Sequence, residues 1–214
     1  MSITYKTAEA VCEGHPDKLC DKIADAVLDA YLRKDKSSRV ACEVMAIGNR
    51  VIVGGEITSE AKVDIPSVVR RVLTDVGLPA NNYRIKVCVR AQSPDIAGGV
   101  NYSLESRNGD DSWYGSMGAG DQGTVYGYAC DECWEKIPLP LKYAHAICEK
   151  LDDCRKSHLV HGILPDGKSQ VTIEYRDGKP HRVQAIVVSV QHKADVNLDQ
   201  LRSEVISKIG RAHV

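Results

Sequence analysis

The chain has 214 residues, 43% of them hydrophobic and 27% charged, a composition typical of one or two globular domains. Its formal net charge of −1 gives no electrostatic reason to expect nucleic acid as a partner. No apolar run approaches the ~20 residues needed to cross a bilayer, and the N-terminus lacks the apolar segment of a signal peptide. We therefore expect a cytoplasmic protein without membrane or nucleic-acid partners.

Eight cysteines are scattered through the chain, which favours reduced core residues over a disulfide framework. Cys130 and Cys133 have the CxxC spacing found in zinc sites, but the sequence offers no second pair of ligands at matching spacing. A zinc module is therefore the least favoured interpretation, and metal analysis would test it.

Residues 13–18, with the sequence Glu-Gly-His-Pro-Asp-Lys, lie where a helix is predicted to begin. Pro16 suits the first helical position, and apolar residues at three-to-four-residue spacing extend the helix to about Lys34. Asp17 falls in the first turn, where the helix dipole favours a carboxylate. With His15 and Lys18 it forms a candidate site for a metal-bound phosphate, although a simple acidic cap is the alternative.

The rest of the first half predicts a β-hairpin from residues 39–47 and 51–58. A second helix follows, capped by Asp64 and ended by Gly77. Alternating apolar and polar residues then predict a strand over 83–90. The predicted order is helix, hairpin, helix, strand.

The second half repeats most of this order. A helix is predicted over 141–157, strands over 169–176 and 182–191, and a last helix from about 195 to 209. Asp177-Gly178 between the strands is a strong signal for a type I′ turn. Because the closing strand does not recur, we predict an α+β fold of repeated helix–hairpin–helix–strand units whose second unit is incomplete.

The two predicted units are separated by residues 92–123, a segment that contains seven glycines. A segment of this length without regular structure is usually either functional or a linker. Its polar ends and its exposed backbone favour a mobile gate over a ligand, with an interdomain linker as the alternative.

Five motifs, taken in order, resemble those of the S-adenosylmethionine synthetases (methionine adenosyltransferases): residues 13–18, 54–58, 92–96, 118–123 and 166–172. The resemblance covers residues 3 to about 208. It implies a fold of three α+β repeats, of which the third, the C-terminal domain, is missing here. The implied boundaries are an N-terminal repeat over 1–91, a gate loop over 92–117 and an incomplete central repeat over 118–208.

The resemblance also implies a reaction. In this family the sulfur of L-methionine attacks C5′ of the ATP ribose and expels triphosphate, which is then cleaved to phosphate and pyrophosphate. Such chemistry needs alignment and charge neutralisation and no enzyme nucleophile. Mg²⁺ and K⁺ are the implied cofactors, and a homodimer or homotetramer with active sites between subunits is the implied assembly.

Site residues follow from the same resemblance. The implied catalytic residues are His15 and Lys18. ATP would be bound by His15, Asp121, Asp166, Gly167 and Lys168. Methionine would be held by Glu56, Gln92 and Asp121. Asp17 would ligate magnesium and Glu43 potassium.

Three of these residues have plain structural alternatives. Glu43 and Glu56 could be outward polar positions of a hairpin, and Lys168 could be a hairpin-edge lysine. Taken from residue patterns alone, these alternatives are the favoured ones.

Residues 209–214 resemble the translation of a short-read sequencing adapter, so we expect this tail to be non-native. We accordingly expect an amino-terminal fragment with little or no synthetase activity of its own. The alternatives are a non-catalytic subunit that pairs with a full-length synthetase and one half of a split synthetase.

Overall fold

The structure is a computed structural model that describes residues 2–93, 103–110, 112 and 123–210. Within these ranges it is an α+β protein with two three-stranded sheets and five α-helices. The chain divides into two compact units, which are described separately. Unit 1 comprises residues 1–19, 73–80 and 128–214, and unit 2 comprises residues 20–72 and 81–127.

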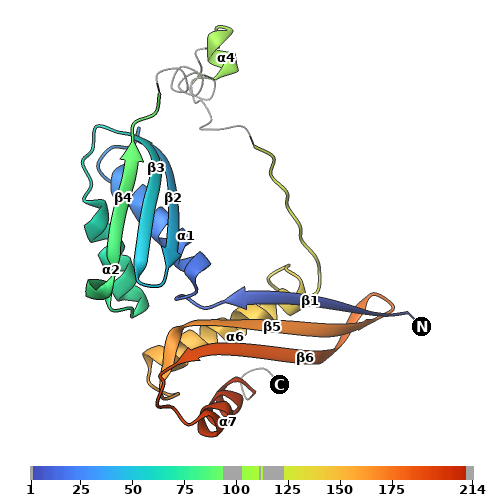
Figure 1. Ribbon diagram of the computed structural model, residues 1–214. Helices are drawn as coiled ribbons and strands as arrows, with labels where there is room; N and C mark the ends of the chain where they lie inside the picture. The colour runs from blue at the N-terminus through green and yellow to red at the C-terminus, as the bar shows by residue number, and fades with distance from the viewer. Residues whose placement is uncertain (1, 94–102, 111, 113–122, 211–214) are drawn as a thin grey trace. The chain divides into compact units, whose positions relative to one another are not determined.

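Unit 2 is built on a sheet of strand order β2-β3-β4 (Figure 1). Strands β2 (Arg39–Ile47) and β3 (Arg50–Thr58) are antiparallel, which confirms the predicted hairpin. Strand β4 (Arg84–Arg90), also predicted, runs parallel to β3. Helices α1 (Pro16–Leu32) and α2 (Ile65–Val76), most of whose residues belong to this unit, lie along one face of the sheet.

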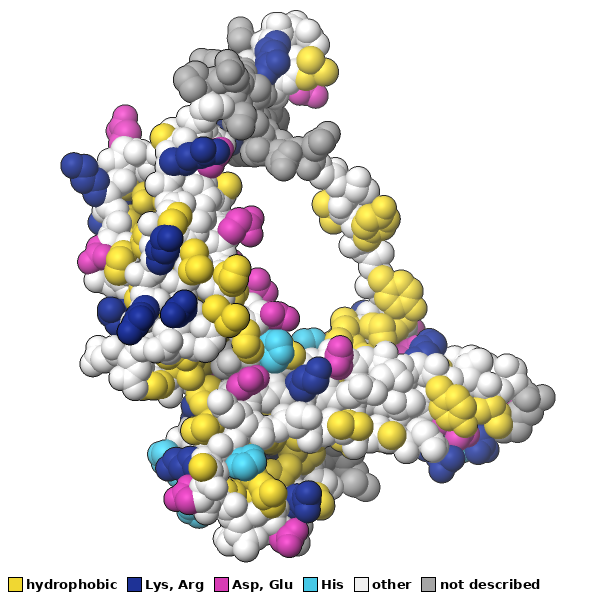
Figure 2. All heavy atoms as spheres, in the orientation of Figure 1, with side chains coloured by type: hydrophobic (Ala, Val, Ile, Leu, Met, Phe, Trp, Pro, Cys, Tyr) yellow, Lys and Arg dark blue, Asp and Glu magenta, His cyan; other side chains and the backbone are white. Residues whose placement is uncertain are grey.

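One face of this sheet is buried and the other is open. Val51 and Val53 of β3 are fully buried, as are Ile23 and Val27 of α1. Because side chains alternate along a strand, the residues between these valines face the opposite, open side. Figure 2 shows Lys and Arg side chains on the side of the molecule that carries this sheet.

Helix α2 ends at Gly77, as predicted. The glycine has φ +88°, its N–H donates to the Thr74 carbonyl, and the Leu78 N–H donates to the Leu73 carbonyl. This pair of bonds is the Schellman motif, which requires a left-handed residue after the helix.

Unit 1 has a sheet of strand order β1-β5-β6. Strands β5 (Ile163–Arg176) and β6 (Lys179–His192) form a hairpin, and the positive φ values of Asp177 and Gly178 confirm the predicted turn. Helix α6 (Leu139–Lys156) packs on β5 and β1. The buried core between them includes residues of all three elements: Ala10, Cys12, Ala144, Ile147, Cys148, Leu151, Val171, Ile173 and Tyr175.

Strand β1 (Ile3–Val11) corrects the sequence analysis, which predicted no strand before the first helix. It pairs antiparallel with β5, from Ile3 opposite Arg176 to Val11 opposite Lys168. The order of elements in each predicted unit is found, but the sheet of unit 1 joins strands that are far apart in the sequence. The predicted repeat itself is not confirmed.

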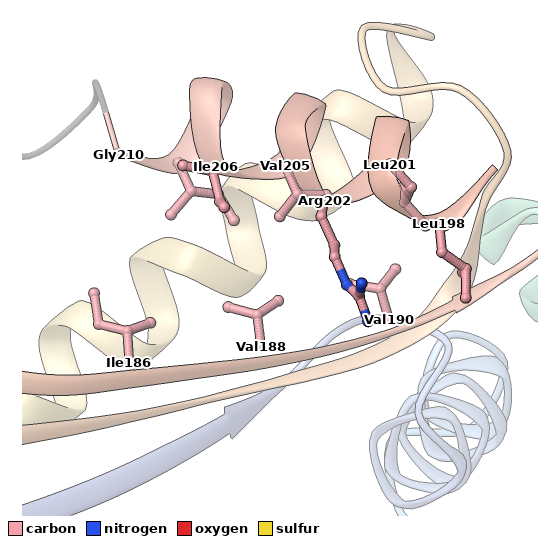
Figure 3. Close-up of a pocket in the computed structure, with 10 residues that line it drawn as sticks. Ile186, Val188, Val190, Leu198, Leu201, Arg202, Val205, Ile206 and Gly210 are labelled. Carbon is pink, nitrogen blue, oxygen red and sulfur yellow. The ribbon is translucent and has the colours of Figure 1, made fainter. Parts of the chain in front are cut away.

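Helix α7 (Leu198–Ile209) begins at Asn197, whose side chain accepts hydrogen bonds from the first-turn N–H groups. Between α7 and β6 lies an apolar groove of about 470 Å³ (Figure 3). It is lined by Val188 and Val190 of β6 and by Leu201 and Val205 of α7, among others. None of the candidate site residues lines this groove.

Of the predicted gate over 92–117, the structure describes residues 92–93, 103–110 and 112. Helix α4 (Leu104–Arg107) is a single turn capped by the side chain of Ser103. The candidate ligand residue Asp121 lies outside the described residues. In the described ranges no helix has both the length and the apolar character needed to span a membrane.

Candidate functional site

In unit 1 the turn before α1 is bonded to the start of β5. The Cys12 N–H donates to the Gly167 carbonyl at 2.8 Å, and the Gly14 N–H donates to the Pro165 carbonyl at 3.0 Å. Gly14 allows this approach, because a Cβ there would lie 2.3 Å from the Cβ of Pro165. Main-chain bonds thus bring together residues 13–18 and 166–168, two motifs distant in the sequence.

A buried carboxylate holds the same turn from the side of helix α6. The Glu13 N–H donates to Asp152 Oδ2 at 3.0 Å, and Asp152 is only 8% exposed. Burial raises the pKa of Asp152, an effect that the hydrogen bond from Glu13 partly offsets. Arg155 lies 3.7 Å from Asp152, while Lys156 pairs with the Glu13 carboxylate.

His15, Asp17 and Lys18 follow directly from this turn. The Asp17 N–H donates to His15 Nδ1 at 3.3 Å, so in the neutral imidazole the proton resides on Nε2, which can act as a donor. The Asp17 side chain is 89% exposed and its carboxylate lies 3.9 Å from the imidazole. Lys18 Nζ donates to the Val11 carbonyl at 2.7 Å. The three side chains therefore stand at one end of β1.

The other motif, residues 166–168, lies within β5. This strand begins at Ile163 rather than at residue 169 as predicted, with an irregularity in its pairing between Ile163 and Gly167. Gly167 is buried against Cys12, and the Lys168 ammonium lies 3.6 Å from Glu9. Because β5 is the central strand of its sheet, Lys168 is not at a hairpin edge, and that alternative was wrong.

In unit 2, Glu43 and Glu56 share the open face of the sheet. Glu43 is paired with Gly54, and Glu56 follows two residues later on the same strand. Glu43 is exposed, whereas the Glu56 side chain is 22% exposed and receives Arg90 Nε at 3.0 Å and Nη2 at 2.9 Å. The hairpin alternative for both residues is therefore partly right, because both do face outward.

Gln92 lies just beyond the end of β4. Its N–H donates to Thr58 Oγ1 at 3.3 Å, next to the end of β3. Its side-chain Oε1 is buried and has no hydrogen-bond partner among the described residues. An open groove of about 490 Å³ lies over the ends of β3 and β4, lined by Gly55, Glu56, Cys88, Val89 and Arg90.

The described residues contain no cluster of three or more His, Cys, Asp or Glu side chains that could hold a metal ion. An exposed single carboxylate such as Asp17 still fits magnesium, because Mg²⁺ is often held by one or two carboxylates together with substrate phosphates and water. Glu43 is likewise a single exposed carboxylate. Of the CxxC pair, Cys133 donates its thiol to the Ile137 carbonyl at 3.0 Å.

Two buried thiols lie beneath the turn and were not singled out from the sequence. The Cys12 thiol donates to the main-chain carbonyl of Cys148 at 3.8 Å, and the Cys148 thiol donates to Ser169 Oγ at 3.4 Å. The interaction between the two thiols lowers the pKa of Cys148 to about 7 and raises that of Cys12. All eight cysteines are free thiols. No sequence signal indicated this pairing, since the two residues belong to β1's end and α6.

Comparison with known proteins covers both halves of the chain. Residues 4–94 match the family model "S-adenosylmethionine synthetase, N-terminal domain", and residues 116–214 match "S-adenosylmethionine synthetase, central domain". Among curated relatives, the S-adenosylmethionine synthase of Finegoldia magna is 44% identical over 212 residues, covering 96% of this chain and 54% of the relative.

Two further relatives carry the same name. Those of Desulfosudis oleivorans and Desulforudis audaxviator are each 42% identical over 210 residues, covering 95% of this chain and 52% and 53% of the relatives. The chain spans about half the length of the curated relatives it matches.

Proposed function

The chain belongs to the S-adenosylmethionine synthetase family, a family of transferases, and from that premise we propose that it takes part in forming S-adenosylmethionine from ATP and L-methionine. One observation carries the proposal. Main-chain bonds at Cys12 and Gly14 hold the His15 turn against residues 165–167, so that the two motifs that carry these basic and acidic groups lie next to each other in unit 1. Such a group of side chains suits a triphosphate.

In the proposed reaction the methionine sulfur displaces triphosphate from C5′, and the triphosphate is then cleaved to phosphate and pyrophosphate. His15 would donate from Nε2 to a phosphate oxygen, while Lys18 and Lys168 would add positive charge as negative charge develops on the leaving group. Magnesium, when bound, would neutralise further phosphate charge, and Asp17 would hold it. Asp166 and Gly167 would complete the nucleotide contacts.

Methionine binding is assigned to unit 2 in this proposal. Glu56 and Gln92 would hold the amino-acid end of the substrate, with Asp121 as a further ligand outside the described residues. Glu43 would serve a potassium ion. The gate role of residues 92–117, the cytoplasmic location and an assembly with active sites between subunits belong to the same proposal.

We expect the 214-residue chain on its own to make little S-adenosylmethionine. The two lysines of the motifs already have partners. Lys18 donates a hydrogen bond to the Val11 carbonyl, and Lys168 lies close to the Glu9 carboxylate. These acceptors take one of the three N–H donors of each lysine and part of its positive charge, which leaves less to neutralise a triphosphate. Purified chain incubated with ATP, L-methionine, Mg²⁺ and K⁺ tests this, and rapid turnover would refute it.

The binding step is tested separately by calorimetry with magnesium and ATP on the full chain. Lys168→Ala should weaken ATP binding about tenfold, the loss of one charge-assisted contact. Lys179→Ala, an exposed position at the start of β6, is the matched control and should bind as the unsubstituted chain does. If the unsubstituted chain binds no ATP, or if both variants bind equally well, the phosphate site is wrong.

A further inference from the structure

The side chains of Cys12 and Cys148 meet beneath the turn that leads to His15. The Cys12 thiol donates to the main-chain carbonyl of Cys148 at 3.8 Å, and the two thiols also interact directly with each other. Cys12 directly precedes the motif of residues 13–18, and Cys148 lies in helix α6. The fold thus brings into contact two thiols that are 136 residues apart in the sequence.

Strand β5 explains why the two thiols lie side by side. Gly167 and Ser169 are two residues apart on this strand, so their side-chain positions share one face of the sheet. A Cβ at Gly167 would lie 3.1 Å from Cys12 Sγ, and the Cys148 thiol donates to Ser169 Oγ at 3.4 Å. Because glycine has no side chain, it leaves the room that Cys12 occupies beside Cys148.

The surroundings of Cys148 favour its thiolate, which is the nucleophilic form of a cysteine. The contact with Cys12 is the main cause that lowers the pKa of Cys148 to about 7, and Ser169 and Lys18 act in the same direction, against the opposing effect of burial. At neutral pH a substantial part of Cys148 is therefore ionised, and a second sulfur lies in contact with it. A cysteine that forms a disulfide after oxidation needs both of these conditions.

We propose that Cys12 and Cys148 form a reversible disulfide when the chain meets hydrogen peroxide, and that this bond fastens the His15 turn to helix α6. The Cys148 thiolate attacks one peroxide oxygen, which gives a sulfenic acid and the first water. The Cys12 sulfur then attacks the sulfenic sulfur, the S–S bond forms and the second water leaves. The two thiols lose two electrons and two protons in all, and both protons end in the two waters. The inference goes beyond the proposed function and does not depend on it.

Access of the peroxide sets the rate of this reaction. Cys12 and Cys148 are each 3% exposed, so the oxidant reaches them only when the structure opens locally. We therefore expect the pair to react more slowly than Cys88, which is exposed. Cys154 lies on the same helix as Cys148 but is buried in a separate apolar cluster, and it therefore serves as the control for burial.

The link is tested by peptide mapping of the full chain. The reduced chain is treated with hydrogen peroxide and its remaining thiols are blocked with N-ethylmaleimide. Trypsin then releases residues 7–18 and 143–150, each of which contains one cysteine. We expect these two peptides to be joined through Cys12 and Cys148, and we expect dithiothreitol to separate them. Non-reducing electrophoresis should show the chain as a monomer, because the bond lies within one molecule.

A second measurement shows whether the link forms in the folded structure. A disulfide restricts the unfolded chain, so oxidation should raise the urea midpoint of unfolding, and dithiothreitol should reverse the rise. Cys148→Ala should lose both the linked peptide and the rise, whereas Cys154→Ala should keep both. The proposal is overturned if the two peptides stay unlinked under peroxide that oxidises Cys88, or if Cys12 or Cys148 is joined to other cysteines instead. A lower urea midpoint of the linked chain would also overturn it.

Discussion

The main chain around the candidate groups of unit 1 is fixed by hydrogen bonds, whereas in unit 2 the candidate residue Glu56 is held by a side-chain ion pair. The Cys12, Glu13 and Gly14 N–H groups are all engaged by β5 or by Asp152. Glu56, by contrast, is held by an exposed arginine. The comparison teaches that the turn of unit 1 is set by the fold itself, whereas the orientation of Glu56 in unit 2 depends on a single exposed arginine.

The largest expected effect is at Gly14. In Gly14→Ala the new Cβ would meet the Cβ, carbonyl carbon and carbonyl oxygen of Pro165 at 2.3–2.8 Å, and the backbone atoms cannot rotate away. We expect a loss of about 3 kcal/mol in the free energy of unfolding, as for an overpacked core. Urea denaturation followed by circular dichroism measures it.

Gly127→Ala is its control, because a Cβ at Gly127 has no heavy atom within 4 Å. Its stability should change by less than about 0.5 kcal/mol. Equal stability of the two variants would show that the His15 turn is not packed against β5.

A smaller loss is expected when the buried acceptor of the turn is removed. Asp152→Ala leaves the Glu13 N–H without its partner and Arg155 without its nearest carboxylate. We expect about 2 kcal/mol of destabilisation, the cost of an unsatisfied buried donor. Asp153→Ala, at the exposed neighbouring position, should change little, and a similar loss there would argue against a specific role for Asp152.

Asp152 should also give the chain a characteristic pH dependence. Its pKa is raised by burial, so the folded state favours the protonated carboxyl. The stabilisation from this proton is complete below the pKa of an unfolded aspartate and is lost as pH rises through the folded value. Relative to the unsubstituted chain, Asp152→Asn should therefore be least stable at low pH and should recover toward pH 7. Urea titrations at pH 4 and pH 7 check the sign.

A further contact of unit 1 lies away from the candidate site. The buried Tyr175 hydroxyl donates to Glu132, which also receives the Leu139 N–H at 2.9 Å and Lys6 Nζ at 3.0 Å. Tyr175→Phe removes one donor of three and should cost about 1 kcal/mol. Thermal unfolding measures this loss. An unchanged midpoint temperature would mean that Lys6 and Leu139 are sufficient to hold the Glu132 carboxylate in place.

The smallest effect is expected in unit 2. Arg90→Ala should alter the free energy of unfolding by less than about 0.5 kcal/mol, because the pair is exposed. A loss as large as that of Asp152→Ala would remove the contrast between the units and make the Glu56–Arg90 pair a structural one. The same denaturation series measures both variants.

Local signals in the sequence were sufficient for most elements. The helix ended by Gly77 and the hairpin through Asp177-Gly178 were predicted because each depends on residues close together in the chain. Strand β1 was missed because its side chains are mostly exposed and its partner, β5, is remote. The start of β5 was misplaced for a related reason. Lys168 pairs with Val11 of β1, which is remote in the sequence, and residues 166–168 show no alternation of apolar and polar side chains.

The candidate site divides in the same way. Residue types and order pointed to His15, Asp17 and Lys18, which are local to one turn. Asp152 and Arg90 were missed because their roles arise only when α6 meets the turn and when β4 pairs in parallel with β3. A one-dimensional pattern cannot indicate such partners, since nothing in the sequence near either residue differs from an ordinary surface charge.

The pairing of β1 with β5 also bears on synthesis. All strands of unit 2 have been synthesised once the ribosome has passed Arg90. The sheet of unit 1 cannot form until Arg176, the partner of Ile3, has been synthesised. Long-range pairings of this kind form slowly, and domains generally fold as units while the chain emerges from the ribosome. We therefore expect β1 to remain unpaired in the nascent chain after unit 2 has folded. At that stage its unpaired backbone is open to mispairing and to chaperone binding.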